Sequence, residues 1–363
     1  MNILIVKLSA IGDVIHALPV SYVLRKKYPD AHITWVVEPT AYEILKHNPC
    51  VDEVIIFNKK AFKSWKGFKE NYKPFKKMLN KRKYDISIDL QGLFKSAAVV
   101  FTANAKQKIG YVDMREGSNF ISKCIRGNNQ YGHIVDRYLD TVKFLGCDIE
   151  NIQFPLENTT EEIDFVNNLL EKSGLKLIEK NIFEKYVAFA VGTNWVNKCW
   201  STTHFAKLSQ LLAEKQIKVI LLGFGTKDEQ KANEIMTLAN TDNIINFVSK
   251  TNLLQTARII KLASAVVGGD TGNLHLAAAL NVPAIMLMGP TDPNRNGPYR
   301  QKENVILAGH ECDGCWKRVC AKNIDCLSII QPEQVMQKLE KIGLVKNNER
   351  EFFESTNTRT ISN

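Results

Sequence analysis

The chain has 363 residues, more than one ordinary hydrophobic core supports, which favours two domains of typical size. Its composition, 45% hydrophobic and 24% charged, excludes a disordered protein. A net charge of +10 favours an anionic partner: nucleic acid, an anionic membrane surface or a phosphorylated substrate.

Neither a leader nor a membrane span is expected. The N-terminus has no basic leader, and Lys7 and Asp13 interrupt its apolar run, so we expect a cytoplasmic protein. The longest uncharged run, residues 271–291, is interrupted by Pro283 and Gly289. It predicts a helix followed by a buried strand.

Short β-rich runs alternate with helical patterns, which predicts parallel sheets covered by helices on both faces. The predicted strands form two sets: residues 2–8, 32–37, 52–57, 84–90 and 107–111, then 186–191, 218–224, 243–248, 265–269 and 284–289. We expect an α/β protein with two Rossmann-like, doubly wound parallel-sheet domains. Side by side they would form a cleft at the carboxyl ends of their strands, where such sheets bind ligands.

One helical pattern separates the two sets of strands. It starts at Thr159 or Thr160, which can form a capping box with the glutamates that follow, and it ends at Gly174. Three segments follow: an N-terminal domain (1–160), a C-terminal domain (175–345) and a polar tail that we expect to be loose (346–363).

The positive charge is concentrated in residues 59–83, which hold eleven basic residues and one acid, Glu70. Aromatic side chains are interleaved with the lysines: Phe62, Trp65, Phe68, Tyr72 and Phe75. The pattern fits a solvated amphipathic helix, or a surface for anionic lipid or a phosphorylated acceptor. Because no nucleic-acid-binding motif accompanies the charge, we expect no nucleic-acid partner.

Asp270, Thr271 and Gly272 follow a predicted strand at the point where the next helix begins. Free N–H groups and the helix dipole make such a position suitable for phosphate. Capping by Asp270 or Thr271 would also explain this pair. His275, one turn later, either faces the same cleft or is structural.

Two further loops follow strands of the second set. GTNWVNKCW offers Thr193 and Asn194 as polar contacts and Lys198 as a cation that can neutralise a departing phosphate without metal. LLGFGTKDEQ places Glu229 in a first helical turn, where it can hold ribose hydroxyls or simply favour the helix. The third glycine of a dinucleotide fingerprint is missing, so NAD, and with it an epimerase, is not expected.

The first strand leads into Gly12, which permits a tight turn, and Asp13. Asp13 can either cap the following helix or act as a catalytic group. Lys95 and Arg115 follow later strands of the first set and should face the same cleft. The chain has no Asp-x-Asp pair, which argues against a transferase that holds its nucleotide through a divalent metal.

These residues resemble the lipopolysaccharide heptosyltransferases of glycosyltransferase family 9, most closely the heptosyltransferase I branch. The resemblance extends to about residue 342 and rests on VKLSAIGDVIHALP, WVVEP, IDLQGLFKSA, TNWVNKCW, GGDTGNLHLAAAL and GPTDP. It implies a GT-B fold, with the acceptor in the first domain and the donor in the second. The implied donor contacts are Thr193, Asn194, Lys198, Glu229, Thr251, Asp270, Thr271, Gly272 and His275.

The resemblance also implies an inverting transfer of L-glycero-D-manno-heptose from ADP-heptose to Kdo-bearing lipid A, in lipopolysaccharide core biosynthesis, without cofactor or metal. Asp13 would be the catalytic base, and Gly12, Lys95 and Arg115 would lie on the acceptor side. The lipid acceptor would hold the enzyme peripherally on the cytoplasmic face of the inner membrane.

Three alternatives to this function remain open. One is heptosyltransferase II-type transfer to the first heptose, and another is a family 9 transferase with a different sugar donor. The third, a basic binding protein without activity, would leave Asp13, Lys198 and the Asp270 helix unexplained.

Four of the eight cysteines form a C-x2-C-x4-C-x5-C pattern: Cys312, Cys315, Cys320 and Cys326. The pattern resembles family members nearer heptosyltransferase II. These thiols could bind zinc or an iron–sulfur cluster, remain reduced, or have a redox role, and their spacing is not that of common zinc ribbons.

Overall fold

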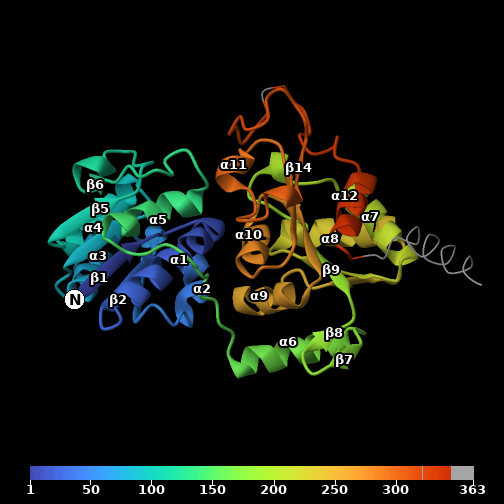
Figure 1. Ribbon diagram of the computed structural model, residues 1–363, viewed down its shortest axis with the longest axis horizontal. Helices are drawn as coiled ribbons and strands as arrows, with labels where there is room; N and C mark the ends of the chain where they lie inside the picture. Colours follow the sequence, from blue (N-terminus) through green and yellow to red (C-terminus); the bar gives the residue numbers. More distant parts are fainter. Residues whose placement is uncertain (321, 345–363) are drawn as a thin grey trace, which may run out of the picture.

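The computed structural model describes residues 1–320 and 322–344, which form two α/β domains side by side (Figure 1). The first holds a parallel sheet in the order β3-β2-β1-β4-β5-β6. Its strands are β1 (Asn2–Val6), β2 (His32–Val37), β3 (Glu53–Ile56), β4 (Ile86–Asp89), β5 (Gln107–Gly110) and β6 (Lys123–Cys124). Its helices are α1 (Ile11–Lys27), η1 (Pro39–Ala41), α2 (Tyr42–Lys46), η2 (Lys59–Phe62), α3 (Trp65–Leu79), α4 (Phe94–Ala103), η3 (Ser118–Phe120) and α5 (Ile134–Phe144).

The second domain repeats this topology, with the parallel order β11-β10-β9-β12-β13-β14. Its strands are β9 (Tyr186–Ala190), β10 (Lys218–Leu222), β11 (Ile244–Asn246), β12 (Ala265–Gly269), β13 (Ala284–Met288) and β14 (Val305–Leu307). Its helices are η4 (Val196–Lys198), α7 (Thr202–Glu214), α8 (Thr226–Ala239), α9 (Leu253–Leu262), α10 (Gly272–Ala279), α11 (Pro293–Asn296), η5 (Lys302–Asn304) and α12 (Pro332–Lys341).

The ten predicted strands are all present, and each sheet has one short edge strand, β6 or β14, that the sequence did not reveal. The central strands β4, β9, β12 and β13 are buried along their whole length, as expected when helices cover both faces of a sheet. The uncharged run folds into α10 and β13, as predicted. No helix in the described part of the chain is long and apolar enough to cross a membrane.

Helix α6 (Thr160–Lys172) connects the two domains and packs against α9. The predicted capping box is present: Thr159 Oγ1 accepts a hydrogen bond from the Glu162 N–H at 3.3 Å, and Glu162 Oε2 accepts one from the Thr159 N–H at 3.1 Å. A hairpin of β7 (Leu177–Glu179) and β8 (Ile182–Phe183) follows, which the sequence pattern did not predict. The predicted loose tail lies outside the described residues.

The two domains share an apolar interface. Helices α1 and α2 of the first domain face α10 and α9 of the second (Figure 1). One cluster of buried side chains continues across, and includes Val14 of α1 and Leu274 of α10. Helix α1 follows β1, and helix α10 follows β12. Because the N-termini of these two helices lie together, the carboxyl ends of β1 and β12 also lie close to each other.

Candidate active site between the two domains

The N-termini of α1 and α10 touch through two glycines, Gly12 and Gly272. A methyl group on Gly12 would lie 2.7 Å from Cδ2 of His275, and one on Gly272 would lie 3.7 Å from the Gly12 nitrogen. A side chain on Gly12 would therefore force the His275 ring or the helix to move, whereas one on Gly272 would be tight against Ile11. The close approach places Asp13, the next residue of α1, beside the first turn of α10.

Asp270 is the centre of a buried polar cluster at the start of α10. Its Oδ2 accepts hydrogen bonds from Lys198 Nζ at 2.6 Å and from Thr291 Oγ1 at 2.9 Å, and its Oδ1 lies 2.8 Å from His275 Nε2. Burial would raise the pKa of Asp270, but the bonds and charges of His275 and Lys198 hold that pKa well below its usual range. Asp270 therefore remains a carboxylate that orients two potential donors.

The capping explanation for Asp270 and Thr271 is not supported. Thr271 occupies the N-cap position of α10 without a capping bond from its side chain, and the Asp270 carboxylate is engaged in the cluster. The first N–H groups of α10 therefore keep their capacity for an anion.

The loop that carries Lys198 passes directly over the end of β12. A methyl group on Gly269 would lie against the Lys198 carbonyl oxygen, so this strand end must be glycine. Nζ of Lys198 also lies 4.2 Å from the centre of the Trp195 ring. Thr193 Oγ1 holds the loop through the Trp195 N–H at 3.2 Å, whereas Asn194 is exposed.

The other predicted donor residues lie along the same edge of the second sheet. Thr251 follows β11, Glu229 follows β10, Thr193 follows β9 and Asp270 follows β12, and these four strands are neighbours in that order. At ~4.8 Å between strands, this edge extends over roughly 15 Å, enough for an extended nucleotide. Thr251 Oγ1 is 2.8 Å from Thr256 Oγ1.

Asp13 lies at the third position of α1 and uses its two oxygens differently. Oδ2 accepts a hydrogen bond from the Ala10 N–H at 3.1 Å, which is the capping role that the sequence allowed. Oδ1 lies 3.9 Å from Lys7 Nζ, and the side chain is 38% exposed. One oxygen is thus held by the backbone while the carboxylate stays accessible.

Lys7 is a buried cation behind Asp13. Its Nζ donates to the Tyr138 hydroxyl at 2.7 Å and to the Leu90 carbonyl at 3.1 Å. Burial lowers the pKa of Lys7, and the nearby carboxylates of Asp13 and Asp89 oppose this shift. Lys7 therefore lies on the buried side of the predicted base, with its Nζ 3.9 Å from the Asp13 carboxylate.

The predicted acceptor residues, like Asp13, follow strands at the carboxyl edge of the first sheet. Lys95 Nζ is 2.6 Å from Glu38 Oε1 and donates to Ser9 Oγ at 2.9 Å, so its ammonium contacts the loop that precedes α1. Arg115 follows β5 with an exposed side chain, and its N–H donates to the Gly92 carbonyl at 2.7 Å.

Sequence reasoning missed several residues that shape the site. Lys7 and Thr291 lie inside the motifs VKLSAIGD and GPTDP, but nothing local shows their partners. Arg295 of the second domain reaches Asp113 of the first at 3.3 Å. Asp228, next to the predicted Glu229, packs against Gly192 and Gly223 and joins two strand ends.

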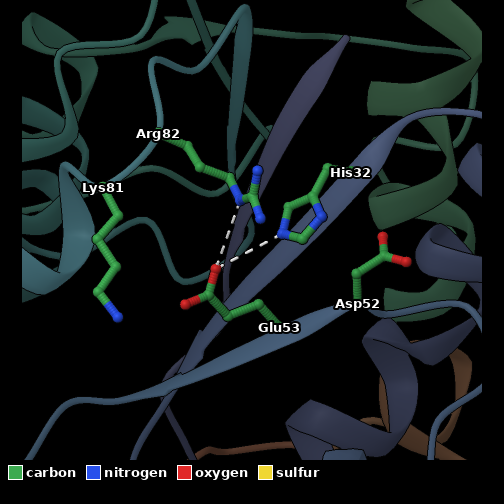
Figure 2. A pocket seen from close by; sticks show the side chains of 5 residues that line it. All are labelled: His32, Asp52, Glu53, Lys81 and Arg82. Atoms are coloured by element: carbon green, nitrogen blue, oxygen red, sulfur yellow. Dashed lines mark ion pairs between the residues drawn. The ribbon is translucent and has the colours of Figure 1, made fainter.

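A polar pocket elsewhere on the first domain does not compete with this site. Figure 2 shows its lining residues: His32, Asp52, Glu53, Lys81 and Arg82. It lies where β2 and β3 begin, at the edge of the sheet opposite to Asp13. Its charges largely satisfy one another, since Glu53 Oε2 lies 3.7 Å from Arg82 Nε and 3.5 Å from His32 Nε2.

The four clustered cysteines are free thiols in the structure. Burial, together with the neighbouring thiols Cys320, Cys315 and Cys312, raises the pKa of Cys326 to about 11. The described residues include no group of three His, Cys, Asp or Glu side chains placed to hold a metal ion. The structure thus places Cys320, Cys315 and Cys312 near Cys326 without a disulfide.

Comparison with known proteins agrees with this architecture. The model of glycosyltransferase family 9 (heptosyltransferase) matches residues 73–324. Lipopolysaccharide heptosyltransferase 1 of Escherichia coli K12 is 31% identical, over 86% of this chain and 95% of its own, and that of Pseudomonas aeruginosa is 27% identical, over 95% and 98%.

Solved structures are similar over nearly the whole chain. The E. coli heptosyltransferase WaaC with ADP matches with a TM-score of 0.72 and 29% identity, over 94% of this chain and 100% of its own. The fold is that of the GT-B heptosyltransferases. Together with the two facing domains, these matches show that the chain belongs to glycosyltransferase family 9.

Proposed function

We propose that the protein is an inverting heptosyltransferase that moves heptose from ADP-heptose to the Kdo-bearing lipid A core. Residues 1–160 would bind the acceptor and residues 175–345 the nucleotide sugar. The observation that supports this best is the contact between the N-termini of α1 and α10, because it sets Gly12, the residue before Asp13, against His275 of the cluster with Asp270 and Lys198.

The donor half has the chemistry that a sugar diphosphate needs. The N-terminus of α10 and the Lys198 ammonium would neutralise the charge that develops on ADP as it leaves. Asp270 would hold Lys198 in place, and Glu229 and Thr251 would contact the nucleoside further along the edge. Solved structures of the relative WaaC contain ADP and ADP-2-deoxy-2-fluoro heptose, which supports an ADP-sugar donor here.

On the acceptor half, Asp13 would take the proton from the attacking hydroxyl while its oxygen bonds to the anomeric carbon from the face opposite ADP. The configuration at that carbon would invert. Lys7 would stabilise the carboxylate before the proton arrives, and Lys95 and Arg115 would meet acidic groups of the acceptor.

Purified protein mixed with ADP-heptose and Kdo-bearing lipid A should release ADP and yield a product heavier by one heptose. An acceptor that already carries the first heptose, and a panel of other nucleotide sugars, would identify the alternative activities. No ADP release with any donor and acceptor pair would refute the proposed function.

A further inference from the structure

The basic segment of residues 59–83 accounts for the whole net charge of the protein. It contains eleven basic residues and one acid, and the chain as a whole has a net charge of +10. The segment folds into η2 and α3 on the first domain, and its lysines are exposed. The rest of the molecule is formally neutral, so this charge is a local feature.

Helix α3 buries its apolar face at one end only. Trp65, Phe68, Tyr72 and Phe75 follow one another at intervals of three or four residues and therefore share a face. Phe75 is 8% exposed and packs under the sheet, whereas Phe68 is 39% and Trp65 72% exposed. A helix that only covered the sheet would bury this face along its whole length.

The exposed aromatic rings stack on one another. Trp65 and Phe68 stack with ring centres 6.0 Å apart, and Phe68 and Tyr72 stack at 5.1 Å. Phe62 links this stack to the buried ring of Phe57 at 5.0 Å. The exposed ring of Trp65 is thus connected through Phe68 and Phe62 to a ring in the core.

Two further exposed phenylalanines belong to the same side of the domain. Phe94, the first residue of α4, is 70% exposed, and Phe120 of η3 is 87% exposed. Helix α4 packs against both α3 and η3, and Glu116 Oε2 accepts a hydrogen bond from the Phe94 N–H at 3.1 Å. Helices α3 and α4 begin after β3 and β4, at the sheet edge that also carries Asp13.

We propose that this lipid-docking face, formed by Trp65, Phe68, Phe94 and Phe120 with the lysines of residues 59–69, binds the surface of an anionic bilayer. The inference rests on the proposed function, since a lipid-linked acceptor is held in such a bilayer. Aromatic rings enter the interfacial layer, and each basic side chain strengthens attachment to anionic lipid roughly fivefold.

The positive charge of the lipid-docking face favours an anionic bilayer over a second copy of the chain. A second copy of the chain would place two strongly positive segments against each other, which opposes association. An anionic bilayer offers both the negative charge and an apolar layer for the rings. Docking there would turn the edge that carries Asp13 toward the headgroups.

The test is sedimentation of the purified full chain with vesicles at about 0.1 M salt. Vesicles of phosphatidylglycerol and phosphatidylethanolamine should bind the protein, and phosphatidylcholine vesicles should not. The double variants W65S/F120S and K66E/K69E should each weaken binding at least roughly tenfold. Matched exposed changes on the second domain, I178S and K207E/K215E, should leave binding unchanged.

Equal binding of wild type and both test variants would overturn the proposal, as would equal binding to neutral vesicles. A dimer that W65S/F120S dissociates, without any vesicle binding, would assign the face to a second copy instead. The assay contains neither ADP-heptose nor acceptor, so its outcome is independent of the proposed reaction. With detergent-dispersed acceptor, W65S/F120S should keep wild-type turnover.

Discussion

Asp13 carries the proposed proton transfer, and its geometry permits a sharp test. In Asp13→Asn the amide oxygen can still accept the Ala10 N–H, but the side chain can no longer take a proton. We expect kcat to fall ~10²–10⁴-fold while the KM for the donor stays within about twofold. Initial rates of ADP release measure both. Asp148→Asn, at an exposed carboxylate, is the control, and an unchanged kcat in Asp13→Asn would exclude the base role.

Asp270 is expected to matter for both stability and donor binding. Asp270→Asn leaves the Lys198 ammonium without its buried counter-charge, which should lower the free energy of unfolding by about 3–5 kcal/mol. Thr291→Val removes one hydrogen bond from the same carboxylate and should cost about 1 kcal/mol. Urea unfolding gives both values, and calorimetry should show weaker ADP binding for Asp270→Asn. Equal stability of the two variants would argue against a buried ion pair.

Among single residues, the sequence identified candidate site residues because they come directly after predicted strands. Asp13, Lys198 and Asp270 each follow an apolar run, so their place at a sheet edge was predictable. Their partners were not, because Thr291 lies 21 residues from Asp270 and Tyr138 lies 131 residues from Lys7. Only packing between elements brings such groups together.

At the scale of elements, the contact of α1 with α10 depends on the absence of a side chain at residue 12. Gly12→Ala would place a methyl group 2.7 Å from Cδ2 of His275, so the helices must separate or the ring must move. Alanine favours a helix interior, so a loss would come from the contact rather than from α1 itself. We expect a fall in kcat of roughly tenfold or more and a lower melting temperature.

Ala17→Ser is the control for Gly12→Ala. It changes another buried position of α1, one that is not part of the contact with Gly272, and so measures how strongly kcat responds to any substitution in this helix. Comparing the kcat of the two variants after normalising for folded fraction separates misalignment of the site from simple destabilisation. If Gly12→Ala had wild-type kcat and melting temperature, the tight contact would have no role.

Elements with many buried apolar residues were predictable, and marginal ones were not. The ten predicted strands are central or carry strong apolar runs. By contrast β6 has two residues, β14 three, and β7 is exposed throughout. Such short segments become strands only because a neighbouring strand pairs with them, which single-sequence patterns do not show.

At the scale of the whole molecule, three histidines meet between the domains. The ring of His16 lies 4.2 Å from that of His275 and 5.5 Å from that of His133. His133 Nε2 is 2.9 Å from the Gly297 carbonyl of the other domain. Burial, together with His275, His133 and nearby cations, lowers the pKa of His16 well below its usual value, and burial lowers the pKa of His133 to about 4.

These pKa shifts make the domain interface sensitive to acid. The unfolded chain protonates its histidines near pH 6.5, whereas the folded chain keeps His16 and His133 neutral to lower pH. Below about pH 6.5 the unfolded state therefore binds more protons, so stability is complete above that pH and decreases progressively toward pH 4. We expect the melting temperature to fall by roughly 5 °C between pH 7.5 and 5.

In His16→Gln the slope of melting temperature against pH should be smaller, whatever the stability at pH 7.5. His47→Gln, outside the cluster, should keep the wild-type slope, and a wild-type slope in His16→Gln would show that acid acts elsewhere.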